Sequence, residues 1–199
     1  RSLKHTQIES LTLRMHYLPL FPELPETLTR LRFDSSAVTE IPSLADTGLE
    51  SLSLGWNSLT AIPELPASLK NLEIFYMREL KILPELPQLT RLRVNSCYKL
   101  EKIAEFPESL EVFLIGFCGS LKELPHLPSL KHIWIAQCRE LTSLPDSMVV
   151  DTLILDFCDN ITNLPADIVI QSRLQMTGMK IKNLPDFGED VQVVDMEDY

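Results

Sequence analysis

The sequence predicts a solenoid of the α/β repeat class that is mostly β. It is expected to be a curved, right-handed coil with a concave parallel β-sheet of about ten short strands and an extended, polyproline-like convex side. Three observations support this fold. Apolar residues recur every 20 or 21 residues, each unit contains a short apolar alternation, and the 199 residues include 35 leucines and 14 prolines. So much proline excludes a bundle of long helices, because each interior proline removes a backbone donor.

The repeat is carried by one central apolar residue in each unit. The ten anchors are Leu11, Leu31, Leu52, Leu72, Leu92, Phe113, Ile133, Leu153, Leu174 and Val194. A second apolar residue follows two positions later, from Leu13 in the first unit to Met196 in the last. Alternation over so short a run is typical of a strand. These residues are therefore expected to face inward, and the residues between them outward.

The rest of each unit contains apolar–proline steps, such as Ile62-Pro63 and Leu65-Pro66. Proline fixes φ and pushes the preceding residue toward extended geometry, so the return segments are expected to be extended and not helical. A strand of about five residues cannot bury its apolar face alone, whereas stacked copies bury a continuous core. Residues 1–199 are therefore expected to form a single domain of about ten repeats.

Charge and hydropathy narrow the classes of function. The formal charge of −10 argues against binding to nucleic acid or to an anionic membrane surface. No apolar run approaches the ~20 residues needed to span a bilayer, so no membrane insertion is expected. The start of the chain lacks a signal-peptide pattern. Because the chain begins at Arg1 and not at Met, flanking caps or domains are expected outside these residues.

The unit from Leu49 to Pro66, LESLSLGWNSLTAIPELP, resembles a leucine-rich repeat, whose core is L-x-x-L-x-L-x-x-(N/C)-x-L. With its short period and L-P-x-L-P steps, the chain is similar to the bacterial subclass found in IpaH- and YopM-like effectors. This resemblance implies a leucine-rich-repeat solenoid that acts as a non-catalytic protein–protein recognition module. It also implies a virulence protein that is secreted into a host cell and binds a host protein in the reducing host cytosol.

Departures from that bacterial pattern leave two alternatives open. Four units place cysteine where the pattern has asparagine, and this C-x-x-L variant also resembles repeats of plant-type and other eukaryotic receptors. One alternative is the substrate-recognition domain of an effector ubiquitin ligase whose catalytic domain is absent from residues 1–199. The other is the sensor segment of a nucleotide-binding immune receptor.

The residues at this asparagine or cysteine position are expected to form a structural ladder. They are Asn57, Cys97, Cys118, Cys138 and Cys158. The cysteines are one repeat apart, which places them in a file about 5 Å apart. Such a file cannot converge on a tetrahedral metal ion, so no metal site is expected. Each thiol is expected to be buried and to donate a weak hydrogen bond to a turn carbonyl, as in a reducing compartment.

No constellation of catalytic residues is found in the sequence. The four histidines share no register, and neither a phosphate-binding glycine loop nor an H-E-x-x-H motif occurs. The chain is therefore expected to have no enzymatic activity and to need no cofactor.

The outward residues of the strands predict a binding surface on the concave face. The candidate residues are Arg32, Trp56, Phe75, Tyr76, Arg91, Arg93, Leu114, Phe117, Trp134, Ile154 and Phe157. Aromatic residues and arginines of this kind are typical of binding hot spots, so the expected partner is a protein bound by a monomer. As an alternative, Trp56, Tyr76, Phe117 and Phe157 could fold over the sheet edge as packing. Trp134 and Phe75 are the expected exposed anchors.

Overall fold

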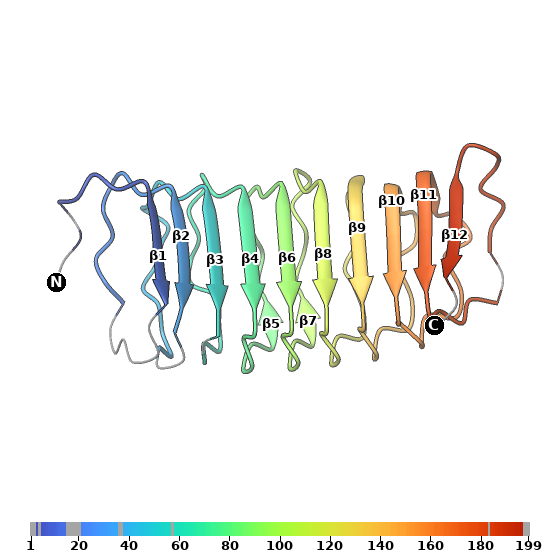
Figure 1. The fold of residues 1–199 in the computed structure, drawn as a ribbon, viewed down its shortest axis with the longest axis horizontal. Helices are drawn as coiled ribbons and strands as arrows, with labels where there is room; N and C mark the ends of the chain where they lie inside the picture. Colours follow the sequence, from blue (N-terminus) through green and yellow to red (C-terminus); the bar gives the residue numbers. More distant parts are fainter. Residues whose placement is uncertain are drawn as a thin grey trace.

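A computed structural model describes residues 3, 5–14, 21–35, 38–56, 58–182 and 184–196. Ten strands form one parallel sheet, in which each strand pairs with that of the next coil. They are β1 (Ser10–Arg14), β2 (Arg30–Asp34), β3 (Ser51–Gly55), β4 (Asn71–Phe75), β6 (Arg91–Asn95), β8 (Val112–Gly116), β9 (Leu130–Ala136), β10 (Val149–Asp156), β11 (Val169–Thr177) and β12 (Gln192–Met196). Figure 1 shows them side by side along the long axis of the molecule.

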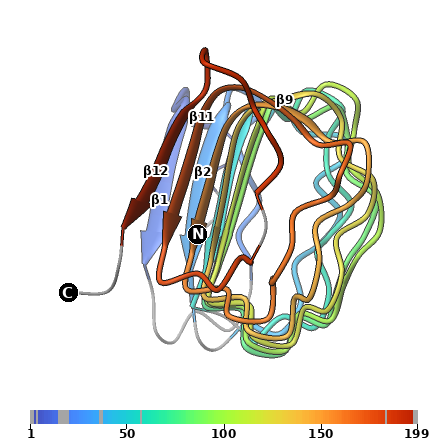
Figure 2. The ribbon, with the colours of Figure 1, turned by 90° about the vertical axis from the view of Figure 1, so that its right-hand side faces the viewer.

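The return segments form the back of the coil. Two of them contain short strands, β5 (Ile82–Leu83) and β7 (Lys102–Ile103), which pair in parallel with each other. No helix occurs in the described residues, and hence none there is long and apolar enough to cross a membrane. Figure 2 shows the sheet on one side of the coil and the extended returns on the other.

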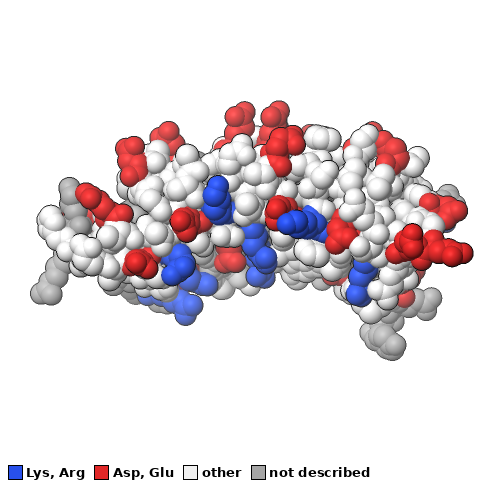
Figure 3. All heavy atoms as spheres, turned by 90° about the horizontal axis from the view of Figure 1, so that it is seen from above, with Lys and Arg blue, Asp and Glu red and all other residues white. Residues whose placement is uncertain are grey.

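The coil has the predicted handedness and curvature. In Figure 1 the strands run downward in front, the chain returns behind them, and each following strand lies to the right, which makes the coil right-handed. Seen from above, the molecule bends so that the sheet lies on its concave side (Figure 3). The prediction of a curved, mostly β solenoid with an extended convex side is confirmed.

The inward residues of the strands form one continuous core. In the central coils the anchors Leu52, Leu72 and Leu92 are completely buried, and so is the second apolar residue of each of their strands. Burying a leucine side chain is worth about 1.5–3 kcal/mol relative to leaving it exposed. A coil therefore gains most of its stability from the coils on its two sides, which explains why the repeat is strict in the middle of the chain.

The register of the last strand differs from the prediction. Leu11 pairs with Leu31 as expected, and the predicted anchors stay aligned as far as Leu174. The partner of Leu174 is Val193, however, and not Val194. A shift of one residue exchanges the two faces of a strand, so Val194 and Met196 face outward instead of inward. Val193, which takes the inward position instead, is 44% exposed. Little buried apolar surface in the described structure therefore fixes the register of this strand.

Candidate binding surface on the concave sheet

The parallel register arranges the outward side chains of the sheet in three columns. The middle column consists of Thr12, Arg32, Ser53, Glu73, Arg93, Leu114, Trp134, Ile154, Gln175 and Val194. Neighbouring members are about 5 Å apart, because that is the spacing of strands in a sheet. The three columns contain six of the nine arginines of the chain and no lysine. Arginine suits a recognition surface because its planar guanidinium binds carboxylates in a bidentate way.

The outward residues of β2, β3, β4 and β6 form what we call the arginine region. It contains Arg30, Arg32, Arg91 and Arg93 against two acids, Asp34 and Glu73. This part of the sheet is therefore net positive in a chain whose formal charge is −10. Most of the acidic side chains visible from above lie along the convex back and the C-terminal end, away from these strands (Figure 3).

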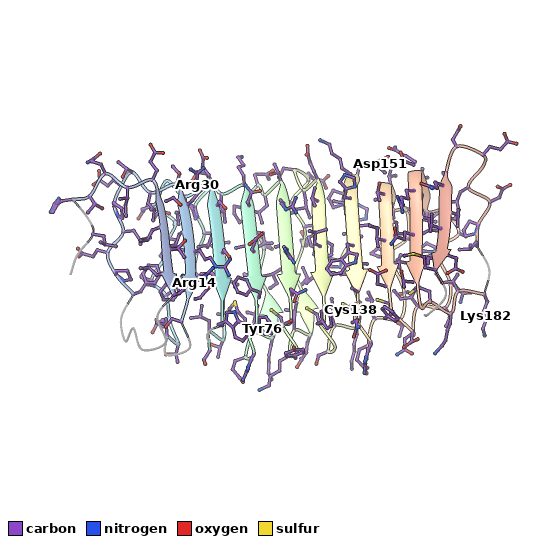
Figure 4. The ribbon with its side chains drawn as sticks, in the orientation of Figure 1. Arg14, Arg30, Tyr76, Cys138, Asp151 and Lys182 are labelled. Carbon is purple, nitrogen blue, oxygen red and sulfur yellow. The ribbon has the colours of Figure 1, made fainter. Side chains whose placement is uncertain are left out.

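Asp34 fixes the N-terminal side of the arginine region. Its Oδ2 atom lies 2.9 Å from Nε of Arg32 and 3.5 Å from Nε of Arg14. The Asp34 side chain is only 10% exposed, and its buried Oδ1 atom has no hydrogen-bond partner among the described residues. Figure 4 shows Arg14 near the lower end of β1 and Arg30 at the upper end of β2.

Phe75 lies flat on the sheet because the neighbouring strand has a glycine at that place. Gly55 is the strand partner of Phe75, and a Cβ atom at Gly55 would overlap the Phe75 ring. The guanidinium carbon of Arg32 lies 4.8 Å from the centre of the same ring, in a cation–π contact. Phe75 is thus held between a glycine and an arginine. Its side chain is half-buried, whereas the sequence predicts an exposed anchor.

A cavity of about 220 Å³ opens between these groups. It is lined by Arg32, Glu73, Phe75, Tyr76, Arg93 and Asn95. Two guanidinium groups and one carboxylate give this cavity a net positive charge, and the two rings give it an apolar wall. The predicted residues Arg32, Phe75, Tyr76 and Arg93 are therefore brought together, and Arg91 lies on the same face of β6 as Arg93.

The outward residues of β8, β9 and β10 form a second area, which we call the apolar region. Its middle column holds Leu114, Trp134 and Ile154, all half-buried. The indole Nε1 of Trp134 donates a hydrogen bond of 2.6 Å to Oδ2 of Asp156. The Trp134 ring also passes over Gly116, where an added Cβ would lie 3.4 Å from it. These two contacts explain why Trp134 is half-buried and not the exposed anchor that the sequence predicts.

The residues directly after the strands form a row of aromatic side chains, which we call the rim. Its members are Trp56, Tyr76, Phe117 and Phe157. Trp56 is 49% exposed, Phe117 40% and Phe157 39%, and the ring of Tyr76 stacks on Trp56 with centroids 3.9 Å apart. Figure 4 shows Tyr76 at the lower end of the sheet, where these turns lie. The rim side chains are thus partly packed and partly open to solvent.

The residue directly after the strand, whether or not it belongs to the rim, has a left-handed backbone in every described coil from β3 to β10. The φ angles are +52° at Trp56, +53° at Tyr76, +55° at Phe117 and +52° at Phe157, and Ser96 and Gln137 adopt the same conformation. A non-glycine residue in this region costs about 1–2 kcal/mol. The cost is tolerated because each of these N–H groups donates to a carbonyl of the following coil, as Phe117 does to Ala136 at 2.9 Å.

The ladder lies directly behind the rim. All four cysteines are fully buried and form no disulfide. The thiols of Cys118, Cys138 and Cys158 each donate to the carbonyl two residues before them, at 3.4–3.5 Å, and the thiol of Cys97 does so at 3.6 Å. Burial raises the pKa of Cys138 to about 12 and also raises the pKa of Cys158. The thiols of Cys138 and Cys158 are therefore protonated and poor nucleophiles at neutral pH.

Two further ladder residues were missed in the sequence. Met77 occupies the ladder position after β4 and is completely buried, and the sulfur of Met179 accepts a hydrogen bond from the N–H of Cys158 at 3.4 Å. Both were recognisable as the residue that follows the strand by two positions, as Cys97 does. The predicted ladder residue Asn57 lies outside the described residues. Within the described part of the chain, no group of three or more His, Cys, Asp or Glu is placed to hold a metal ion.

Comparison with known proteins identifies the family of these repeats. No curated protein and no solved structure shows a significant match to the chain. Residues 42–185 match the family described as plant disease resistance protein RPS2-like, leucine-rich repeats. The match covers well over half of the chain and includes β3 to β10, so it contains the apolar region and the part of the arginine region on β3, β4 and β6, but not β2. The chain therefore belongs to the RPS2-like family of leucine-rich repeats.

Proposed function

We propose that this chain is a non-catalytic recognition module that binds a protein partner through its concave sheet. The observation that carries the proposal is the sequence of outward residues from β2 to β10. An arginine region with an open cavity adjoins an apolar region, and a partly exposed aromatic rim follows both. Exposed aromatic and arginine side chains in one continuous area are typical of protein-binding hot spots.

The solenoid favours binding because the surface is formed before the partner arrives. Each strand is paired on both sides, except at the two ends of the sheet, and the backbone under the surface is fixed by the buried core. A preformed surface loses little conformational entropy on association. We infer that affinity depends on the outward side chains and not on an ordering of loops.

The family match favours one setting for this module, the sensor segment of an immune receptor of the disease-resistance type. A secreted bacterial effector acting in the host cytosol is a second candidate, because the doubled L-P steps are similar to those of bacterial short repeats. The substrate-recognition domain of an effector ubiquitin ligase, whose catalytic domain is absent from residues 1–199, is a special case of this second candidate. Four buried free thiols suit a reducing compartment in either setting. The gene around this segment separates them, since a preceding nucleotide-binding domain supports the sensor and a following helical domain with a catalytic cysteine supports the ligase.

The proposed function is tested by comparing capture of proteins from a eukaryotic cell lysate by three forms of the chain. Trp134→Asp places a charge in the centre of the apolar region, whereas Lys122→Glu changes the charge on the convex side of the coil. We expect that the wild type and Lys122→Glu capture the same protein and that Trp134→Asp no longer captures it. Equal far-ultraviolet circular dichroism of the three forms verifies the fold. Capture that is unaffected by Trp134→Asp contradicts binding through the concave sheet.

A further inference from the structure

The donors around the cavity of the arginine region are more numerous than the acceptors that they contact. Arg32 donates from its Nε atom to Asp34 and lines the cavity, and its terminal nitrogens have no hydrogen-bond acceptor among the described residues. Arg91 and Arg93 form no ion pair with any described residue. The side-chain oxygen Oδ1 of Asn95 accepts a hydrogen bond from the Ser96 hydroxyl at 2.7 Å, so the side-chain nitrogen Nδ2 remains a donor.

One acceptor is already present on the cavity wall. The carboxylate of Glu73 accepts a long hydrogen bond, 3.4 Å, from the Ser53 hydroxyl and forms no ion pair among the described residues. Glu73 therefore offsets one of the two guanidinium charges of the cavity, and Arg91 adds a further positive charge next to it. Since successive residues of a strand rise about 3.3 Å, Arg91 and Arg93 lie about 7 Å apart on the same face. This spacing suits two carboxylates of one extended chain.

The surroundings of the cavity limit what can carry these carboxylates. Phe75 and Tyr76 form an apolar wall beside the guanidinium groups, and their rings meet edge to face at 6.5 Å. The next strand beyond Arg93 presents Leu114, which begins the apolar region. A ligand that fits both areas has acidic groups at one end and apolar side chains at the other, within a few residues. A polypeptide has both kinds of group at this spacing.

We propose that the arginine region binds an acidic segment of a partner protein, with one carboxylate in the cavity beside Arg93 and a second on Arg91. The segment then continues across β8 and places apolar side chains over Leu114 and Trp134. This inference rests on the proposed function and adds to it the chemistry and the direction of the partner. Charge complementarity supports it, because the arginine region is net positive in an otherwise acidic chain.

The test uses selection from a library of random dodecapeptides displayed on phage, with the whole chain as bait. Enriched peptides are synthesised, and their affinities are measured by fluorescence anisotropy. We expect a consensus of two acidic residues followed by aromatic or aliphatic residues. Arg91→Glu with Arg93→Glu should weaken binding at least about tenfold, since charge-assisted hydrogen bonds are lost and replaced by repulsion. High salt should weaken wild-type binding in the same direction.

The matched control carries the same change of charge on the convex back. Lys102→Glu with Lys122→Glu gives the same net charge as the arginine double variant, and both lysines line a separate hollow behind the sheet. This control should keep wild-type affinity. If it weakens binding as much as the arginine variant does, long-range charge explains the effect and the proposed contact is wrong.

The remaining outcomes separate this inference from the proposed function. If neutral or basic peptides are selected, and Trp134→Asp abolishes their binding but the arginine variant does not, the proposal of an acidic partner is wrong and the recognition surface remains supported. Peptides insensitive to every concave substitution, or a failure to enrich any peptide, count against both. A single-stranded DNA oligonucleotide is the last probe. Binding of that oligonucleotide through Arg91 and Arg93 would assign the region to nucleic acid and overturn the proposal.

Discussion

The arginine region and the apolar region occupy the same sheet and are built on the same core, yet different contacts hold their aromatic side chains. Phe75 lies between Gly55 and the guanidinium of Arg32, so its position depends on shape and on a cation–π contact. Trp134 is held by a hydrogen bond to Asp156 and has ordinary contact with Gly116. A repeat scaffold therefore lets neighbouring strands carry different chemistry, because outward residues are free to vary while inward ones are not.

The largest expected effect tests whether the two regions share one core. Ile74 lies beneath the arginine region and Ile135 beneath the apolar region, and both are completely buried. Ile74→Ala and Ile135→Ala should each lower the free energy of unfolding by about 3–4 kcal/mol, because each leaves a cavity in packed surroundings. Urea denaturation followed by circular dichroism measures both. Two resolved transitions in either variant would indicate that the two halves unfold separately.

The next effect concerns the hydrogen bond that distinguishes the apolar region. Trp134→Phe removes the indole donor to Asp156 and should lower the free energy of unfolding by about 1.5 kcal/mol, since this bond has a charged acceptor. A double-mutant cycle with Asp156→Ala isolates the pair. A coupling energy near zero would mean that packing over Gly116, and not the hydrogen bond, positions the ring.

A smaller effect compares the glycines under the two rings. Gly55→Ala should lower the free energy of unfolding by about 1 kcal/mol, because the Phe75 ring must leave its place on the sheet. Gly116→Ala should change it by less than about 0.5 kcal/mol, because its Cβ would lie 3.4 Å from Trp134 and 3.0 Å from the Asn95 amide, where small shifts suffice. Thermal unfolding of both variants checks the difference. Equal effects would show that the arginine region is no more tightly built than the apolar one.

The sequence was sufficient for the scaffold because each anchor is fixed by two neighbouring coils. Leu31 to Leu174 occupy the predicted inward positions for this reason. Val194 does not, since β12 has a pairing partner on one side only among the described strands and its inward residue, Val193, is 44% exposed. The roles of Gly55 and Gly116 depend on which residue lies opposite on the next strand. The alignment of the repeats predicts the register and therefore which residues are neighbours across the strands. It does not predict which aromatic ring covers which glycine.

The left-handed backbone of the rim shows a second limit of what the sequence predicts. Trp56, Tyr76 and Phe117 are residue types that rarely adopt positive φ, so their identities gave no indication of it. The signal was Gly178, which occupies the equivalent position after β11 and has a φ of +58°. In a repeat protein, a glycine in one unit reports the backbone conformation that the other units share.

The smallest expected effect tests whether the left-handed position after a strand stores strain, at Gln137, which directly follows β9 in the apolar region. Gln137 has a φ of +50°, and Gln175 lies in β11 without a positive φ. Gln137→Gly should raise the free energy of unfolding by about 0.5 kcal/mol, because relief of the left-handed strain exceeds the entropy that glycine adds to the unfolded chain. Gln175→Gly should lower it by about 1 kcal/mol, because in a strand the entropic cost of glycine is not offset by any relief of strain and a hydrogen bond from Arg173 is lost. Chemical denaturation of the two variants compares the same substitution in the two conformations. If both variants are destabilised equally, the turn after each strand does not store strain, and the aromatic residues of the rim are there at no cost to the fold.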